Sequence, residues 1–487
     1  MYTLINPNLI VQKSDPFTTG IVYMPIGLAY FAAVLRQNKI KFGIIDAFGE
    51  APQKSRFENG FVIRGLTTQD VVDKIAPQTK AFFLYAINLA SHYSTIEIAK
   101  RLKQSFPKIP IIVFENTQAV TAYSLKAVQK DFYSVGVDYV LTGEVEEKGL
   151  KFVGALEKNG SSEELHTLLE NDKQIEDLDK LPFPAWDLFP LQNYWNLRYA
   201  HGPFETKRYL PLLTSRGCPY PCRFCVIPET NNQKWRARSA ENVVAEMEWF
   251  QKTLGVSEFH IEDVNPTIND ERIQTLCQKI VEKKLKIIWK IAAGTKVESI
   301  KSEKTIEWMA KAGCRYISIS PESGSPKIMQ KIQKPFNIGH ATQLVKAMNH
   351  FGIFSQACFV LGFPGEDDED RKQTINLARL LTKAGIDEIA QFIITPVPGS
   401  KIYNEFSGFK NYSELTFSPS WRRDYKKLAK FRFRLYRRFL LWKLLYHPQK
   451  ILRQIMNFLK LRFETKMEMT PYRALKTWGL ILKARRI

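Results

Sequence analysis

The chain has 487 residues, six cysteines and a net charge of +21, and 45% of its residues are hydrophobic. This length corresponds to about three domains with sizeable cores, which excludes a miniprotein held together by disulfides. Sparse cysteines fit a reducing compartment, and no basic region leads into an apolar segment at the N-terminus. We therefore expect no secretory signal and a cytoplasmic protein.

Residues 1–150 are predicted to form one domain, because strand and helix patterns alternate there as in a doubly wound parallel sheet. Strands are expected at 2–6, 42–46, 81–87, 110–114 and 139–142, and helices at 27–37, 95–104 and 124–129. Ligands bind such sheets at the carboxyl ends of the strands, which gives a predicted pocket rim of Asn6, Pro25, His92, Glu115, Gly143 and Glu144. The uncharged stretch 17–35 is interpreted as a loop leading into a buried helix, with a membrane span as the alternative.

Residues 151–204 are predicted to connect this domain to the next one. The segment is polar and charged up to Asp179 and then reads LPFPAWDLFP. Its prolines keep the backbone extended.

Three cysteines follow the connector in the segment SRGCPYPCRFC, namely Cys218, Cys222 and Cys225. Pro219 and Pro221 prevent a continuous helix, so the thiolates lie on a loop. A closed structural metal site needs four protein ligands. Three thiolates on one short loop therefore predict a metal site with one open position.

The surroundings of this loop suggest how the thiolates are supported. Gly217 permits a tight turn, and Arg216 and Arg223 are expected to place positive charge beside thiols that must lose their protons to bind metal. A zinc knuckle completed by His201 or His260 is the alternative.

A second alternation of strands and helices fills residues 205–405. The expected strands are 209–214, 258–261, 287–291, 316–319, 354–361 and 388–394, and the expected helices are 240–253, 270–283, 302–312, 340–351 and 371–384. Six parallel strands predict a partial TIM-type (β/α)6 barrel. Its active site is expected at the carboxyl ends of the strands, where Cys218, Glu262, Lys296, Glu322 and Pro364 fall.

The cysteine loop resembles the signature of the radical S-adenosylmethionine (SAM) enzymes, in which an aromatic residue, here Phe224, precedes the third cysteine. The resemblance implies a [4Fe-4S] cluster held by Cys218, Cys222 and Cys225, with SAM bound to the fourth iron. It also implies a set of SAM contacts after the second, fourth and fifth strands: Glu262, Asp263, Ser320, Glu322, Gly362 and Pro364. Alternatively, the adjacent carboxylates Glu262 and Asp263 cap the next helix.

The first domain resembles the cobalamin-binding domain of one class of radical SAM proteins, through the phrases MPIGLAYFAAVLRQ, FGIIDA and DYVLTGEVEE. The resemblance implies cobalamin as a further cofactor. The sequence departs from that family in two ways: it has no D-x-H-x-x-G, and Glu115-Asn116 replaces the paired glycines after the fourth strand. His92 either approaches a ligand or forms surface hydrogen bonds.

Residues 406–487 are predicted to form a basic helical region. From Trp421 to Ile487 the chain holds 20 Lys and Arg against 3 Asp and Glu, a balance of +17, which leaves +4 for the first 420 residues. Apolar residues alternate with cations at helical spacing, and Pro448 separates two such runs. Three interpretations stay open: helices that cap the barrel, a helix on an anionic membrane surface, and contact with nucleic acid or an acidic protein.

The resemblances together predict a radical SAM enzyme that cleaves SAM to a 5′-deoxyadenosyl radical, which abstracts hydrogen from an unactivated carbon. With cobalamin, the expected outcome is methyl transfer, and the alternative is an anaerobic oxidative cyclase of the magnesium-protoporphyrin ester type. The non-enzyme alternatives are an iron-sulfur redox sensor and a nucleic-acid-binding protein, the latter without any recognised RNA-binding module.

The expected partners are a small-molecule substrate and an electron donor such as flavodoxin or ferredoxin. If the basic region binds the inner face of a membrane, the substrate class narrows to a lipid, an isoprenoid or a tetrapyrrole. The sequence identifies no catalytic residue on the substrate side.

Overall fold

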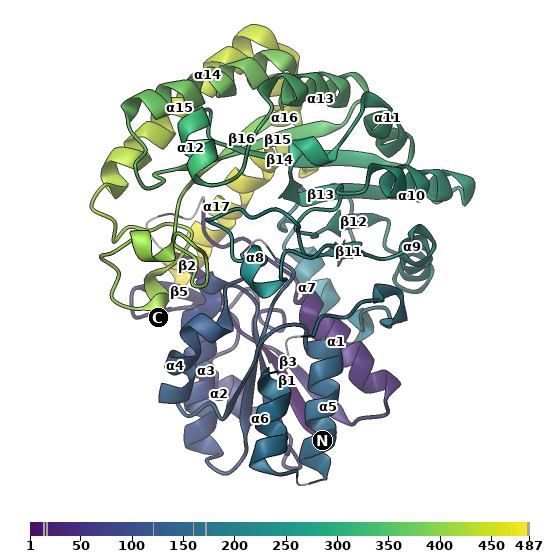
Figure 1. The fold of residues 1–487 in the computed structure, drawn as a ribbon, viewed down its shortest axis with the longest axis vertical. Helices are drawn as coiled ribbons and strands as arrows, with labels where there is room; N and C mark the ends of the chain where they lie inside the picture. Colours follow the sequence, from purple (N-terminus) through teal and green to yellow (C-terminus); the bar gives the residue numbers. More distant parts are fainter. Residues whose placement is uncertain (13–14, 16–17, 120, 159, 171–172, 485–487) are drawn as a thin grey trace.

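Two α/β domains and a helical C-terminal region make up the computed structural model, which describes residues 1–487 except 13–14, 16–17, 120, 159, 171–172 and 485–487 (Figure 1). The first domain lies at the bottom of Figure 1 and the barrel domain at the top. The C-terminal helices contact both domains. This arrangement confirms the predicted fold class.

The first domain is built on a parallel sheet of five strands in the order β3–β1–β6–β7–β8. The strands are β1 (Tyr2–Asn6), β3 (Phe42–Asp46), β6 (Ala81–Ala86), β7 (Ile111–Glu115) and β8 (Tyr139–Leu141). Helices α1 (Ile26–Gln37) and α5 (Val145–Glu157) cover one face, and α2 (Thr68–Asp73), α3 (His92–Ser105) and α4 (Leu125–Ser134) cover the other. Because both faces are covered, a central strand such as β6 (AFFLYA) is apolar along its whole length.

A second, antiparallel sheet in this domain has the order β2–β5–β4 and is not among the predicted elements. Its strands are β2 (Leu9–Gln12), β4 (Ser55–Glu58) and β5 (Phe61–Arg64). Asn59 and Gly60 join β4 to β5 with φ angles of 46° and 85°. Two positive φ angles in a two-residue loop form the hairpin turn that Asn-Gly favours, so this dipeptide was the available signal.

The connecting segment contains α6 (Ser162–Glu170), α7 (Leu191–Asn196) and two short 3-10 turns, Leu178–Lys180 and Trp186–Leu188. The predicted domain boundary at residue 150 falls inside α5, so the last helix of the first domain extends into the connecting segment. Trp186 and Tyr194 are fully buried. The connector is therefore packed into the core rather than exposed.

The barrel domain is a six-stranded parallel sheet in the order β16–β15–β14–β13–β12–β9. The strands are β9 (Tyr209–Leu212), β12 (Glu258–Ile261), β13 (Ile288–Thr295), β14 (Cys314–Glu322), β15 (Phe354–Leu361) and β16 (Glu388–Ile393). The outer helices are α9 (Ala240–Leu254), α10 (Asp270–Glu282), α11 (Glu303–Lys311), α13 (Ile338–His350) and α14 (Asp368–Ala384). The predicted partial barrel is thereby confirmed, and all six carboxyl strand ends lie at one edge of the sheet.

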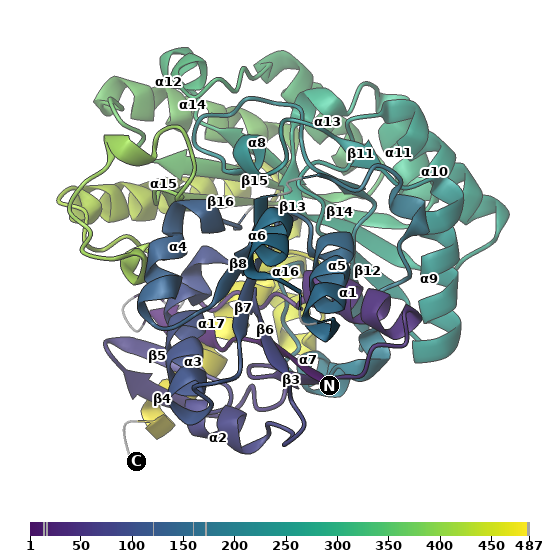
Figure 2. The same cartoon turned by 60° about the horizontal axis from the view of Figure 1, so that its bottom comes forward.

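The C-terminal region forms three helices, α15 (Tyr425–Tyr446), α16 (Pro448–Lys460) and α17 (Lys466–Ala484). Helix α15 packs on α14 and β16 through Leu428, Phe431, Leu435 and Phe439, which repeat at helical spacing and are buried. Helix α17 runs between the two domains and reaches β4 (Figures 1 and 2). Among the described residues, none of the helices combines the length and apolar character needed to cross a bilayer.

Candidate functional site

The three cysteines lie on a loop at the carboxyl edge of the barrel sheet. After β9, the short strand β10 (Ser215–Arg216) pairs with β11 (Arg236–Ala237) and leads into loop 217–225, which ends at α8 (Ile227–Thr230). Gly217 has a φ of 79°, and a Cβ at this position would overlap the carbonyl oxygen of Lys234. Only glycine fits this turn without strain.

The thiols of Cys218, Cys222 and Cys225 are free and partly buried. Burial raises the pKa of all three, that of Cys225 to about 12. Among the described residues, no three His, Cys, Asp or Glu side chains converge on a position where they could hold a single metal ion.

The two histidines of the zinc-knuckle alternative each contact a glutamate. His201 Nδ1 lies 2.6 Å from Glu262 Oε2. His260 Nε2 lies 3.0 Å from Glu258 Oε1 in the buried interior of the barrel.

Lys334 is the main cation beside the cysteines, and it is not among the residues predicted from the sequence. Its Nζ atom is buried, donates to Glu322 Oε1 at 2.5 Å and lies 5.9 Å from the ring centroid of Phe224. Burial opposes the charge of Lys334, but Glu322 and Cys222 more than offset this and raise the pKa of the ammonium. Lys334 in turn acts to lower the pKa of each of the three thiols, against the larger effect of burial.

Lys296 is a second cation at this edge. Its Nζ atom lies 5.0 Å from the ring centroid of Tyr220, within the loop, and donates to Glu298 Oε2 at 2.5 Å. Lys296 also acts to lower the pKa values of Cys218 and Cys222. These two lysines provide the positive charge beside the thiols.

The prediction that Arg216 and Arg223 provide this charge is wrong. Arg216 Nη2 lies 2.5 Å from Glu146 Oε1, and its Nη1 lies 3.4 Å from Glu144 Oε1. Arg236 binds Glu144 through two contacts of 2.8 and 2.9 Å. Arg223 pairs with Glu405 at 3.2 Å. The buried arginines therefore tie the cysteine loop to the first domain.

The candidate SAM contacts fall into two groups. Phe224, Ser320, Glu322, Gly362 and Pro364 lie at the carboxyl edge near the cysteines. Phe224 packs edge-on against Phe363, with ring centroids 5.6 Å apart. Glu322 has a positive φ of 57°, a strained backbone conformation of the kind found at functional sites. Gly362, with a φ of 82°, begins the turn after β15.

Glu262 and Asp263 do not reach this group. Asp263 is fully buried and accepts hydrogen bonds from Thr214 N and Oγ1 and from Ser215 Oγ, at 2.5 to 2.7 Å. Its carboxylate therefore holds the end of β9, which gives no support to a SAM contact. Glu262 pairs with His201 instead of capping a helix. Helix α10 is capped by Asn269.

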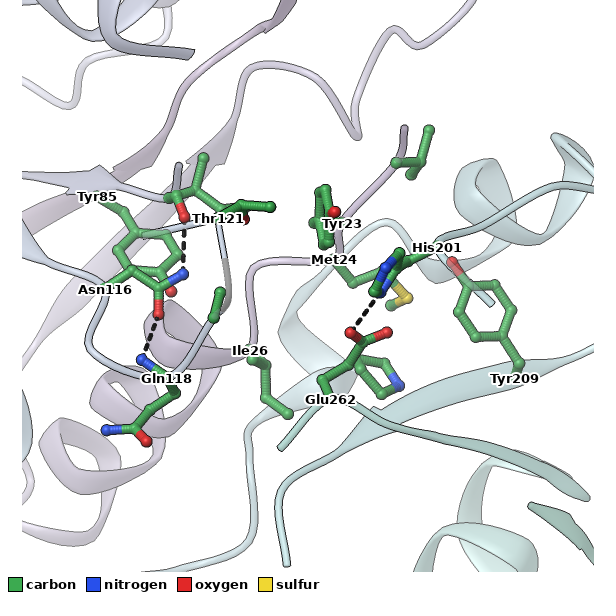
Figure 3. A pocket seen from close by; sticks show the side chains of 14 residues that line it. Tyr23, Met24, Ile26, Tyr85, Asn116, Gln118, Thr121, His201, Tyr209 and Glu262 are labelled. Atoms are coloured by element: carbon green, nitrogen blue, oxygen red, sulfur yellow. Dashed lines mark hydrogen bonds and ion pairs between the residues drawn. The ribbon is translucent and has the colours of Figure 1, made fainter. Parts of the chain in front are cut away.

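Glu262 and His201 line a cavity between the carboxyl edges of the two sheets (Figure 3). The first domain contributes Tyr23, Met24, Tyr85, Asn116, Gln118 and Thr121, and the barrel side contributes His201, Tyr209, Pro211 and Glu262. In the part of the chain that the structure describes, Tyr209 Oη and Gln118 Oε1 have no hydrogen-bond partner. Buried polar atoms without partners indicate that the cavity receives a polar ligand or water. Burial lowers the pKa of His201, so its imidazole is neutral near pH 7.

The volume of this cavity can be compared with the space that the expected cobalamin would need. The cavity volume is about 30 Å³, which holds about two water molecules. Glu115 and Asn116 replace the glycines that close approach of a corrin would favour, and Tyr85 Oη lies 2.6 Å from where a Cβ of Gly27 would be. As the two domains pack here, this cavity is smaller than a corrin ring.

Two residues of the predicted rim, His92 and Glu115, have structural roles. His92 begins α3 and is buried, with its ring nitrogens 3.1 Å from Tyr123 Oη and 3.3 Å from Asp131 Oδ2. It is therefore not a surface residue, and both of its ring nitrogens contact protein groups. Glu115 accepts from the backbone N–H groups of Leu125 and Gly143, so it joins the loops that follow β7 and β8.

Comparison with known proteins gives a consistent result. Residues 212–378 match the family model described as the Radical SAM superfamily. The chain is 26% identical over 466 residues to the cytidylyl-2-hydroxyethylphosphonate methyltransferase of Streptomyces wedmorensis, with 86% of this chain and 84% of that protein covered. It is 25% identical over 354 residues to the anaerobic magnesium-protoporphyrin IX monomethyl ester cyclase of Synechocystis sp., with 67% of each chain covered.

A solved structure shows the same fold. The radical S-adenosylmethionine methyltransferase TsrM from Kitasatospora setae, with cobalamin and a [4Fe-4S] cluster bound, matches with a TM-score of 0.60 and 14% identity. The match covers 83% of this chain and 74% of that chain. The expectation of a cobalamin-binding-like domain followed by a radical SAM barrel is confirmed at the level of the fold.

Proposed function

From the match of residues 212–378 to the Radical SAM superfamily model, we propose that the chain is an enzyme that cleaves SAM and methylates a carbon atom of a small molecule. The cysteine loop carries the proposal: three free thiols lie at the carboxyl edge of a parallel barrel, beside the buried cation Lys334. The similarity to a methyltransferase over 86% of the chain supports methyl transfer as the outcome.

Cys218, Cys222 and Cys225 would hold three irons of a [4Fe-4S] cluster and leave the fourth for SAM. The bound cluster supplies the low-potential electron that splits SAM into methionine and a 5′-deoxyadenosyl radical. Lys334 and Lys296 favour the deprotonated thiols that bind iron.

The residues around the loop suggest how SAM is held. Glu322 and Ser320 lie at the end of β14, where a polar ligand can meet a carboxylate and a hydroxyl. Gly294, on the neighbouring strand, has a φ of 102°, and a Cβ there would lie 2.7 Å from Ser320 Oγ. Its missing side chain makes room for the hydroxyl of Ser320. Gly362 and Pro364 remain candidates for contact with the adenine.

The proposed substrate side is the interface between the two domains, which must part to admit a substrate larger than the two water molecules that the packed cavity holds. The neutral His201, paired with Glu262, can accept a proton that the substrate loses there. Cobalamin is part of this proposal only if the two domains part to admit it, since the packed cavity has no room.

An oxidative cyclase is the second candidate, because a cyclase of this type is similar to the chain over two thirds of both sequences. Under either proposal the enzyme is cytoplasmic and receives its electron from a small donor protein such as flavodoxin or ferredoxin. If the basic helical region binds a membrane, the proposed substrate class is a lipid, an isoprenoid or a tetrapyrrole.

The proposal is tested on protein purified and reconstituted without oxygen. We expect about four irons per chain and dithionite-dependent formation of 5′-deoxyadenosine. Both should be lost in Cys222→Ala and retained in Cys277→Ala, which removes a buried cysteine on α10 outside the loop. Iron binding without SAM cleavage would contradict the enzyme and favour a redox protein.

Two further measurements separate the candidates. Transfer of label from methyl-labelled SAM to an organic product supports methylation, whereas an oxidised product without label supports the cyclase. Corrinoid that copurifies in stoichiometric amount would show that the domains do open.

A further inference from the structure

Helix α16 is turned with its polar side inward. Its buried residues are Lys450, Gln454 and Asn457. Its large apolar residues Leu452, Ile455, Met456 and Leu459 are exposed. A helix on a globular core normally shows the opposite orientation, so the outward apolar face needs an explanation.

The inward orientation is fixed by hydrogen bonds. Lys450 Nζ lies 3.0 Å from Asp387 Oδ1 and donates to Gly385 O at 2.5 Å. Gln454 Oε1 accepts from Lys443 Nζ at 2.5 Å, and its amide donates to Thr465 Oγ1 at 2.9 Å. Turning the helix over would leave these groups unpaired or exposed. The apolar side must therefore face away from the protein.

The end of α15 continues this apolar surface. Lys443 is buried, whereas Leu441, Leu444 and Leu445 are exposed. Lys443 contacts Gln454 of α16, so the inward sides of the two helices meet and their outward sides form one surface. We call this surface the hairpin face, defined by Leu441, Leu444, Leu445, Leu452, Ile455, Met456 and Leu459, whose exposed fractions lie between 44% and 71%.

Exposed cations flank the hairpin face. Arg434, Arg437 and Arg438 are exposed on α15, one to two turns before Leu441 on the same side of the helix. Lys460 is exposed at the end of α16. No Asp or Glu occurs anywhere in residues 425–460. An apolar surface edged by positive charge alone is complementary to an anionic lipid bilayer.

We infer that the hairpin face inserts into the interface of an anionic membrane and holds the enzyme on its surface. A second copy of the chain is a poorer occupant, because a symmetric contact would bring the arginines of both copies close together. No described helix is long and apolar enough to cross the membrane, so the helices lie in its plane. The inference concerns location and does not depend on the chemistry of the cysteine loop.

The test is flotation of the full chain with vesicles of phosphatidylcholine alone or with added phosphatidylglycerol. We expect binding to the anionic vesicles that weakens with salt. Leu452→Gln combined with Ile455→Gln should reduce binding at least about tenfold. Replacing Arg434, Arg437 and Arg438 by Gln should reduce it about a hundredfold on anionic vesicles. The matched control is Trp249→Gln, which removes an exposed aromatic residue from α9.

Circular dichroism and SAM cleavage of each variant show that the fold and the cysteine site are intact, which separates this inference from the proposed function. Equal flotation of the hairpin variant and the Trp249 control would overturn the inference. So would a wild-type chain that fails to float while light scattering detects a dimer that the hairpin variant abolishes.

Discussion

Arg216 offers the sharpest test of how the cysteine loop is attached to the first domain. Its side chain is 3% exposed and contacts Glu146, which is 4% exposed, at 2.5 Å. In the variant Arg216→Met, Glu144 keeps Arg236, but Glu146 becomes a buried carboxylate without its partner. Loss of one member of a buried ion pair costs about 3–5 kcal/mol of unfolding free energy.

The control is Arg36→Met, which breaks the exposed pair of Arg36 with Asp187 and should cost about 1 kcal/mol or less. The double variant Arg216→Met with Glu146→Leu removes both buried charges and should recover much of the loss, because no carboxylate stays unpaired. Urea unfolding followed by tryptophan fluorescence and by circular dichroism measures the difference, with each transition analysed separately in a chain of several domains. The reasoning is refuted if Arg216→Met loses no more stability than Arg36→Met.

Three further predictions concern the site itself. Lys334→Gln removes the buried cation beside the thiols and should lower SAM cleavage about tenfold, with less iron bound per chain. Gly217→Ala forces a side chain into the Lys234 carbonyl at a φ of 79°, so reconstituted protein should hold little cluster by its visible absorption. Because burial lowers the pKa of His201 below 6.5, unfolding takes up a proton, and stability should fall as the pH drops through and below 6.5. His201→Gln should flatten that dependence between pH 5 and pH 7, measured by urea midpoints.

Each of these predictions has a distinct contrary outcome. Lys334→Gln with normal iron and normal SAM cleavage would show that Lys296 alone supplies the needed charge. A full cluster in Gly217→Ala would mean that the loop can adopt another turn. An unchanged pH profile in His201→Gln would assign the acid sensitivity to other buried groups.

Elements can be predicted from the sequence when all their residues lie in the same surroundings, for example when a strand is buried on both faces. Strands such as β6 are buried on both sides, so they read as unbroken apolar runs, and β12 and β15 have the expected bounds. The cysteine loop is predictable because the spacing of its thiols is a local property. The antiparallel sheet was missed since SRFE in β4 is short and mostly polar, with one face exposed.

Other features depend on contacts that the sequence does not encode locally. Lys334 lies more than a hundred residues from the cysteines and in a polar segment without periodicity, so nothing marks it as their neighbour. The alternation of apolar and charged residues in α16 identifies two faces but not which one points inward. That choice depends on Asp387, which lies in the loop before β16 and attracts Lys450.

Helix α17 has a consequence for how the protein is made. The hydroxyl of Ser55 in β4 donates to the carbonyl of Leu480, a bond between residues 425 positions apart. During synthesis, the antiparallel sheet of the first domain therefore cannot pack against α17 until most of the chain has left the ribosome. Until then the nascent protein exposes surface that α17 later covers, and a ribosome stalled after the barrel would display an unfinished first domain to chaperones.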